Sequence, residues 1–182
     1  MNQLDLQVNG GGDALLNNDQ SPEALHRIAA AHRRFGTVGI LPTVITDAPQ
    51  VLARAVEAAI AAKGSQGLLG LHIEGPHLSI PRRGTHAAEW VRPFEDATLD
   101  HIHRLHVAGL FVKITVAPES VTPAQVARIA TTGAVVSIGH SDATADEVRT
   151  LLGAGATCFT HLFNDMSPML NRAPGVTGAC IN

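Results

Sequence analysis

Residues 110–140 read LFVKITVAPESVTPAQVARIATTGAVVSIGH and contain one complete strand–helix–strand unit. The apolar runs Leu110–Val116 and Ala134–Ile138 are rich in β-branched residues and have the length of buried strands. Between them, Thr122 and the proline after it are typical of a helix start, and Gly133 is typical of a helix end. The unit therefore predicts two parallel strands that are joined by a helix.

The same alternation extends through the rest of the chain. The other apolar runs are Leu4–Val8, Val38–Ile45, Leu68–Ile73 and Thr157–His161. The other helix starts are expected at Ser21, Asp47, Asp96 and Thr144, with stops at Gly36, Gly64, Gly109 and Gly153. About five repeats of this kind predict an α/β domain with a parallel sheet covered by helices. Periodicity alone leaves a doubly wound sheet and a (β/α)₈ barrel equally open, and no linker divides the chain.

Composition narrows the classes of function. The net charge of −3 and the six aromatic residues argue against a nucleic-acid binder. No apolar run is long enough for a membrane helix, and a cytoplasmic location is expected. Cys158 and Cys180 are the only cysteines, too few for a disulfide framework or a thiolate zinc site. The ten histidines point instead to chemistry based on imidazole and carboxylate groups.

Three ionisable residues stand where three of the strands are expected to end. Glu74 follows one apolar run, His140 follows another, and His161 ends a third. Parallel α/β folds bind ligands at the carboxyl ends of their strands, so these side chains are expected on one face of the sheet. One carboxylate and two imidazoles form a ligand set of the catalytic metal type.

The alternative for each of these residues is an ordinary cap or surface group beside a Gly-containing turn. Other histidines fit that alternative better. His101, His103 and His106 fall in one expected helix, where residues two apart point to different faces. His72 shares a strand face with Glu74 and could serve as a ligand or as a partner of one. No nucleophilic-serine, P-loop or dinucleotide motif is present.

Seven segments in order carry a family resemblance. They are DLQVNGGG (5–12), LPT (41–43), GLHIEGPHLS (70–79), RGTH (83–86), VAPE (116–119), IGHSDAT (138–144) and HLFNDMSP (161–168). As a set they resemble the N-acetylglucosamine-6-phosphate deacetylases of the metal-dependent amidohydrolase superfamily. The resemblance implies a TIM-barrel-like fold in which residues 1–182 form an incomplete catalytic domain. About six of the eight βα units would be present, without the last two units and without the N-terminal β-sandwich.

The resemblance also implies roles for individual residues. Glu74, His140 and His161 would hold one divalent ion, with zinc or iron expected. His86 would polarise the substrate carbonyl, and the residues implied to contact the sugar phosphate are Thr85, His86, Asn164, Asp165 and Arg172. The aspartate that serves such enzymes as general base on strand eight has no counterpart in this chain. Gln7 occupies the place where many amidohydrolases have a metal-binding histidine, which favours a single metal.

The implied function is hydrolysis of the acetamide of N-acetylglucosamine 6-phosphate, which yields glucosamine 6-phosphate and acetate. The partner would be a small amino-sugar phosphate, with no nucleic acid or membrane, and a homodimer is expected for the full-length family. Two alternatives stay open. The chain could be a catalytically incompetent fragment that binds metal or sugar phosphate, or an amidohydrolase that acts on another amide.

Overall fold

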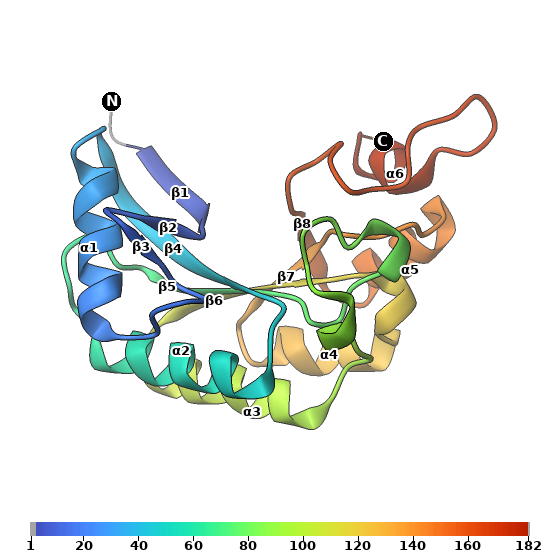
Figure 1. Ribbon diagram of the computed structural model, residues 1–182. Helices are drawn as coiled ribbons and strands as arrows, with labels where there is room; N and C mark the ends of the chain where they lie inside the picture. The colour runs from blue at the N-terminus through green and yellow to red at the C-terminus, as the bar shows by residue number, and fades with distance from the viewer. Residues whose placement is uncertain (1–2, 182) are drawn as a thin grey trace.

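A six-stranded parallel sheet forms the centre of the structure, a computed structural model that describes residues 3–181. In chain order its strands are β1 (Gln3–Val8), β4 (Thr37–Ile45), β5 (Gly70–Glu74), β6 (Phe111–Val116), β7 (Val135–Ile138) and β8 (Ala156–Phe159). Each strand pairs with the one before it, so the spatial order never reverses. A doubly wound sheet requires such a reversal. The fold is therefore the singly wound, TIM-barrel-like alternative, and Figure 1 shows the sheet curled into a half-barrel.

Five helices join consecutive strands and cover the outer, convex face of the sheet (Figure 1). They are α1 (Pro22–Arg33), α2 (Pro49–Ala61), α3 (Asp96–Val107), α4 (Pro123–Thr131) and α5 (Ala145–Gly153). Three 3₁₀ turns lie in the loops: η1 (Ile80–Arg82), η2 (Ala88–Trp90) and η3 (Pro118–Ser120). Three elements lie outside the sequence prediction, namely the short strands β2 (Gly10–Gly11) and β3 (Ala14–Leu15) and the final helix α6 (Gly175–Ile181).

Helix starts follow the sequence signals with one exception. Thr122 and Thr144 each accept a hydrogen bond from the backbone of the third helical residue, and both form complete capping boxes. The start expected at Asp47 is wrong, because Ala48 is the N-cap of α2 and makes no side-chain cap. Asp47 instead accepts hydrogen bonds from the Ala48 backbone N–H and from the Asn17 side chain. Asp47 thus bonds to Asn17, which is distant in the sequence, and does not cap α2.

The two faces of the sheet differ in chemistry. On β5, Leu71 and Ile73 are buried in the apolar core beneath the helices. His72 and Glu74 alternate with them and point to the inner, concave face, where they are also buried. The side chains of β5 that could bind a ligand thus lie on the inner face of the half-barrel. No helix among residues 3–181 is long and apolar enough to cross a membrane.

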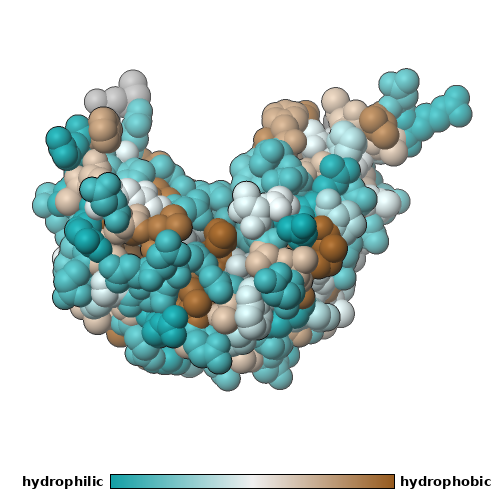
Figure 2. All heavy atoms as spheres, in the orientation of Figure 1, coloured by the Kyte–Doolittle hydropathy of each residue, from teal (hydrophilic) through white to brown (hydrophobic). Residues whose placement is uncertain are grey.

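The sheet has two edges, β1 and β8, that pair with a neighbour on one side only. On β1, Leu4 is 62% exposed and Leu6 is 44% exposed. Figure 2 shows the molecule hollowed between the arm that carries the N-terminal residues and the arm that carries the C-terminal residues. Unpaired edges with exposed apolar residues are surfaces on which a further strand can pair.

Candidate metal centre

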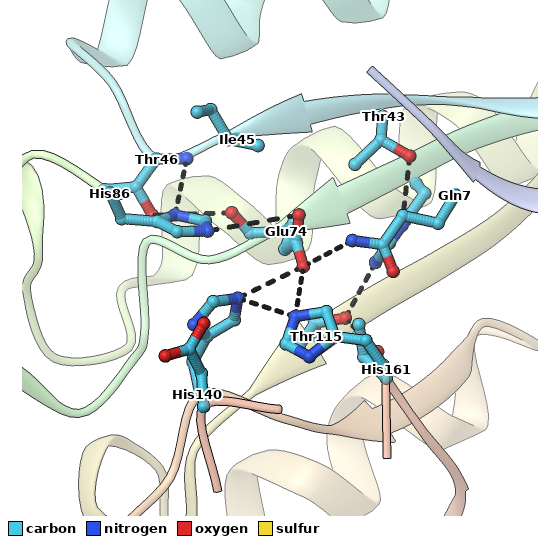
Figure 3. Close-up of polar contacts among 12 residues, drawn as sticks. Gln7, Thr43, Ile45, Thr46, Glu74, His86, Thr115, His140 and His161 are labelled. Atoms are coloured by element: carbon cyan, nitrogen blue, oxygen red, sulfur yellow. Dashed lines mark hydrogen bonds and ion pairs between the residues drawn. The ribbon is translucent and has the colours of Figure 1, made fainter. Parts of the chain in front are cut away.

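Glu74, His140 and His161 converge at the carboxyl ends of three strands, as Figure 3 shows. Glu74 is the last residue of β5, and the histidines follow β7 and β8 by two residues. Glu74 Oε1 lies 3.3 Å from the Nε2 atom of each histidine. The two Nε2 atoms lie 2.9 Å apart. The sequence prediction that these residues share one site thus agrees with the geometry.

The opposite nitrogen of each histidine fixes which atom faces the centre. His140 Nδ1 lies 2.9 Å from the Arg82 carbonyl oxygen, and His161 Nδ1 lies 3.0 Å from the Asn164 carbonyl oxygen. A carbonyl only accepts, so both Nδ1 atoms carry hydrogen, and in the tautomer that this fixes each ring turns its Nε2 lone pair toward Glu74. A cation between three electron-pair donors that face one another would stabilise this arrangement.

The spacing of these donors fits a divalent ion. A tetrahedral ion with bonds of about 2.05 Å separates its ligand atoms by roughly 3.3 Å. Two of the observed separations, at 3.3 Å, match that value, and the third, between the two Nε2 atoms, is shorter at 2.9 Å. The set of one carboxylate and two imidazoles also leaves a coordination position open, as catalytic zinc sites do. We conclude that these residues could hold one metal ion.

In the metal-free chain, a proton shared with Glu74 stabilises part of this cluster. The hydrogen bond to Glu74 raises the pKa of His161 above its ordinary value. For Glu74, burial raises the pKa, but the hydrogen bonds with His140 and His161 outweigh burial and hold the pKa below its usual range. Glu74 is therefore ionised at neutral pH, as a ligand must be.

Gln7 orients the Glu74 carboxylate, a role that sequence reasoning missed. The Gln7 side-chain N–H donates to Glu74 Oε1 over 2.8 Å from the end of β1 (Figure 3). The sequence signal that could have found this role is the long amide side chain of Gln7 near the end of an expected strand. Partners of this kind fix ligand geometry and tune metal affinity.

His86 presents a hydrogen-bond donor to the same centre. The Thr46 backbone N–H donates to His86 Nδ1 over 3.2 Å, so Nδ1 carries no hydrogen and the proton of the neutral ring is on Nε2. This Nε2–H lies 3.9 Å from Glu74 Oε2 (Figure 3). Burial lowers the pKa of His86 to about 4, which keeps the ring neutral at pH 7. His86 can thus donate to a group that carries negative charge in the site.

An open cleft of about 360 Å³ lies over the cluster. Besides the three ligands and His86, its polar lining consists of Gln7, Asn9, Asn17, Thr85, Asn164 and Asp165. Thr85, Asn164 and Asp165, which the resemblance implied as substrate contacts, therefore lie in this cleft. Arg172 does not: it is exposed and lines a separate hollow with Met169 and Ala173. The roles of these residues remain predictions.

Several residues near the cleft have backbone conformations that side chains rarely adopt. The φ angles are +49° for His140, +35° for His161, +78° for Phe163 and +49° for Asp165. Non-glycine residues with positive φ are strained, and such strain clusters at functional sites. The loops after β7 and β8 are therefore shaped to aim the two imidazoles rather than to relax the backbone.

The buried histidines predict an acid-sensitive fold. Burial lowers the pKa of His77, and it lowers the pKa of His72 to about 3, so both bind a proton less readily in the folded state than in the unfolded chain. The unfolded chain protonates them near 6.5 and binds more protons, so stability is lost as pH falls below 6.5. His161 has the opposite effect, because its raised pKa gives a contribution to stability that is present below 6.5 and is lost as pH rises. In the metal-free chain, each of these two histidines should therefore add to the loss of stability at low pH.

Urea unfolding of the metal-free chain at pH 6.0 and 5.0 measures this loss of stability. His77 is the position to test because it lies outside the metal centre, hydrogen-bonded to Thr98 and to the Arg92 carbonyl. The His77→Asn chain should lose less stability than the parent between these two pH values, because the proton uptake of His77 on unfolding is removed. An equal loss in both chains would show that His77 does not titrate on unfolding.

A singly wound parallel sheet with a Glu–His–His cluster at its strand ends defines a TIM-barrel-like fold whose candidate site lies on the face where such folds bind ligands. Comparisons with known proteins narrow this class. The chain is related along nearly its whole length to N-acetylglucosamine-6-phosphate deacetylases. It matches no protein-family model.

The curated relatives include two bacterial deacetylases. The N-acetylgalactosamine-6-phosphate deacetylase of Shewanella sp. strain ANA-3 is 44% identical over 180 residues, which are 97% of this chain and 45% of that protein. The N-acetylglucosamine-6-phosphate deacetylase of Haemophilus influenzae is 35% identical over 182 residues, which are 98% of this chain and 47% of that protein. The chain therefore spans about half the length of the curated relatives it matches.

Solved structures agree with the sequence relatives. The Pasteurella multocida N-acetylglucosamine-6-phosphate deacetylase superposes with a TM-score of 0.92 at 34% identity, over 99% of this chain and 48% of that one. A Mycobacterium smegmatis enzyme in complex with N-acetyl-D-glucosamine 6-phosphate has a TM-score of 0.85 at 32% identity, over 97% and 46% of the two chains. The fold and the family resemblance expected from the sequence are confirmed.

Proposed function

We propose that this chain supplies the metal-binding part of an active site that hydrolyses the acetamide of N-acetylglucosamine 6-phosphate. The observation that carries the proposal is the convergence of three lone-pair donors beside the His86 Nε2–H donor. A divalent ion held by Glu74, His140 and His161 would supply Lewis-acid stabilisation of negative charge and would make water a better nucleophile at neutral pH. Zinc or iron suits this ligand set. The products would be acetate and glucosamine 6-phosphate.

His86 contributes a fixed hydrogen bond to the proposed reaction. The acetamide oxygen gains negative charge when the carbonyl is attacked, and a preoriented donor stabilises that charge. Thr46 holds the ring so that its N–H faces the centre, and this arrangement needs no reorganisation during the reaction. Thr85, Asn164 and Asp165 line the cleft, and their proposed role is to contact the sugar. Cytoplasmic catabolism of amino sugars is the setting we propose.

A second substrate is N-acetylgalactosamine 6-phosphate. It is favoured by the relative with 44% identity, which is named for that sugar phosphate, whereas the Haemophilus relative has 35% identity. Both sugars carry the same acetamide, so the chemistry above applies unchanged. The two substrates differ only in what the sugar-contacting residues must recognise.

A chimera tests the proposed function. The matched 180-residue segment of the Shewanella relative would be replaced by this chain, and acetate release from both sugar phosphates would be measured with and without a chelator. We expect metal-dependent turnover, which His86→Ala should reduce by about 10²–10³-fold in kcat. His77→Asn is the matched control, since this buried histidine lies outside the centre, and its activity should stay near that of the parent. A folded, metal-loaded chimera without acetate release would contradict the proposal.

A further inference from the structure

Five polar side chains form a continuous hydrogen-bonded chain across the inner face of the sheet, one layer below the metal centre. The members of this inner chain are Thr43 on β4, His72 on β5, Thr115 on β6, Ser137 on β7 and Thr160 directly after β8. None of them is more than 1% exposed. The interior of a parallel barrel is ordinarily filled by branched apolar residues. A fully buried polar layer at this place therefore calls for an explanation.

The bonds of the inner chain are short and run from strand to strand. His72 Nδ1 lies 3.2 Å from Thr43 Oγ1, and His72 Nε2 lies 2.7 Å from Thr115 Oγ1. The Thr160 hydroxyl lies 2.7 Å from that of Thr115 and 2.7 Å from that of Ser137. At the other end, a backbone N–H of β1 donates to Thr43 Oγ1 over 3.0 Å. The inner chain thus connects all six strands of the sheet.

One arrangement of hydrogens makes every bond of the inner chain. Thr43 donates to a carbonyl of its own strand at 3.2 Å, so His72 must donate to Thr43 from Nδ1. His72 Nε2 then accepts from Thr115, which accepts from Thr160, which accepts from Ser137. Each hydroxyl donates once. Networks that are satisfied in this way rigidify their surroundings, whereas a lost member leaves buried groups unpaired.

The inner chain lies next to the ligands in sequence as well as in space. His72 is two residues before Glu74 on the same strand face, and Thr160 immediately precedes His161. A metal ion tolerates errors of only about 0.2 Å in its ligand distances. We propose that the inner chain, with His72 and Thr115 at its middle, sets the positions of Glu74 and His161 and thereby the metal affinity. This proposal rests on the metal centre of the proposed function.

The chain offers a matched control for a purely structural role. His77 is also a fully buried histidine, and its Nε2 lies 2.9 Å from the hydroxyl of buried Thr98 on α3. This pair lies outside the layer that connects the strands beneath the metal centre. Thr115→Val and Thr98→Val each remove one hydroxyl from a buried histidine and keep the side-chain shape. Both should lower the thermal midpoint by about 2–4 °C.

Zinc titrations of the metal-free 182-residue chain separate positioning from stability. At a temperature where every variant is folded, Thr115→Val should weaken zinc binding about tenfold, and Thr98→Val should bind as the parent does. Thr115→Ser keeps the hydroxyl and should restore binding to within about threefold. The visible absorption of bound cobalt(II) should change in Thr115→Val alone, because it reports ligand geometry.

Each outcome decides between the alternatives. Equal zinc affinity of Thr115→Val and the parent would overturn the proposal, as would equal weakening by Thr115→Val and Thr98→Val. Failure of Thr115→Ser to restore binding would also overturn it. If Thr115→Val does not fold, Ser137→Ala at the end of the inner chain is judged by the same comparison. A parent chain that binds no zinc would refute the metal centre itself, which is a different failure.

Discussion

Replacing His140 with alanine is expected to abolish metal binding by the chain. The substitution removes one of three lone-pair donors and leaves Glu74 and His161 with too few ligands to hold an ion in a site open to water. After dialysis, elemental analysis should find about one divalent ion per parent chain and almost none per variant chain. Full occupancy of the His140→Ala chain would remove these residues from the metal centre.

The helical histidines provide the control for this loss. His101, His103 and His106 lie on α3, on the outer face of the sheet, as the sequence pattern predicted. Replacing all three with glutamine changes more imidazoles than His140→Ala does, yet metal content should stay near one ion per chain. Loss of metal from the triple variant would show that the strand-end cluster is not the binding site.

Most of the fold could be predicted because its signals are local. The β-branched runs that became β6 and β7 carry the strand period, and the capping boxes at Thr122 and Thr144 satisfy backbone groups within four residues. The end of α5 was placed wrongly at Gly153, which is still helical. Gly155, with φ +118°, makes the left-handed turn instead. The sequence does not show which of two nearby glycines ends a helix, because that depends on what packs against them.

Periodicity could not distinguish a doubly wound sheet from a barrel, because these folds differ in which strands pair. The same alternation of strands and helices fits a sheet that reverses its order and one that does not. Family motifs such as IGHSDAT (138–144) selected the barrel, and the pairing of each strand with its predecessor bears that out. The helix α6 was missed because its seven residues, GVTGACI, include two glycines and lack an amphipathic pattern.

The candidate site also has a part that the sequence predicts and a part that only the structure shows. Glu74, His140 and His161 could be grouped because strand ends of a parallel sheet share one edge. The contacts of Gln7 with Glu74 and of Thr46 with His86 join residues 67 and 40 positions apart, and no local pattern encodes them. Arg172, which the motif match placed with the substrate, lines a different hollow of this chain. The role of Arg172 therefore stays a prediction.

The isolated chain, fully loaded with metal, is expected to deacetylate N-acetylglucosamine 6-phosphate at close to the background rate. Among the described residues that line the cleft, the carboxylates are Glu74 and Asp165. Glu74 Oε1 faces both ligand histidines, and Asp165 Oδ2 accepts a hydrogen bond from the Asn164 side chain over 3.1 Å. Glu74 is taken up by the ligand set, and the resemblance gives Asp165 a contact with the substrate and places the general base on strand eight. A positioned general base contributes about 10²–10⁴-fold in rate.

Parallel assays of the isolated chain and of the Shewanella chimera at equal metal content measure this difference. The chimera should turn over about 10²–10⁴-fold faster, because the Shewanella segments outside the match would supply the general base that the resemblance places on strand eight. Those segments would also pair with the open edges at β1 and β8. Asp165→Asn in the isolated chain is the discriminating variant. If the parent turns over fast and Asp165→Asn abolishes this turnover, Asp165 is the general base. The prediction that the base comes from the Shewanella segments outside the match would then be wrong.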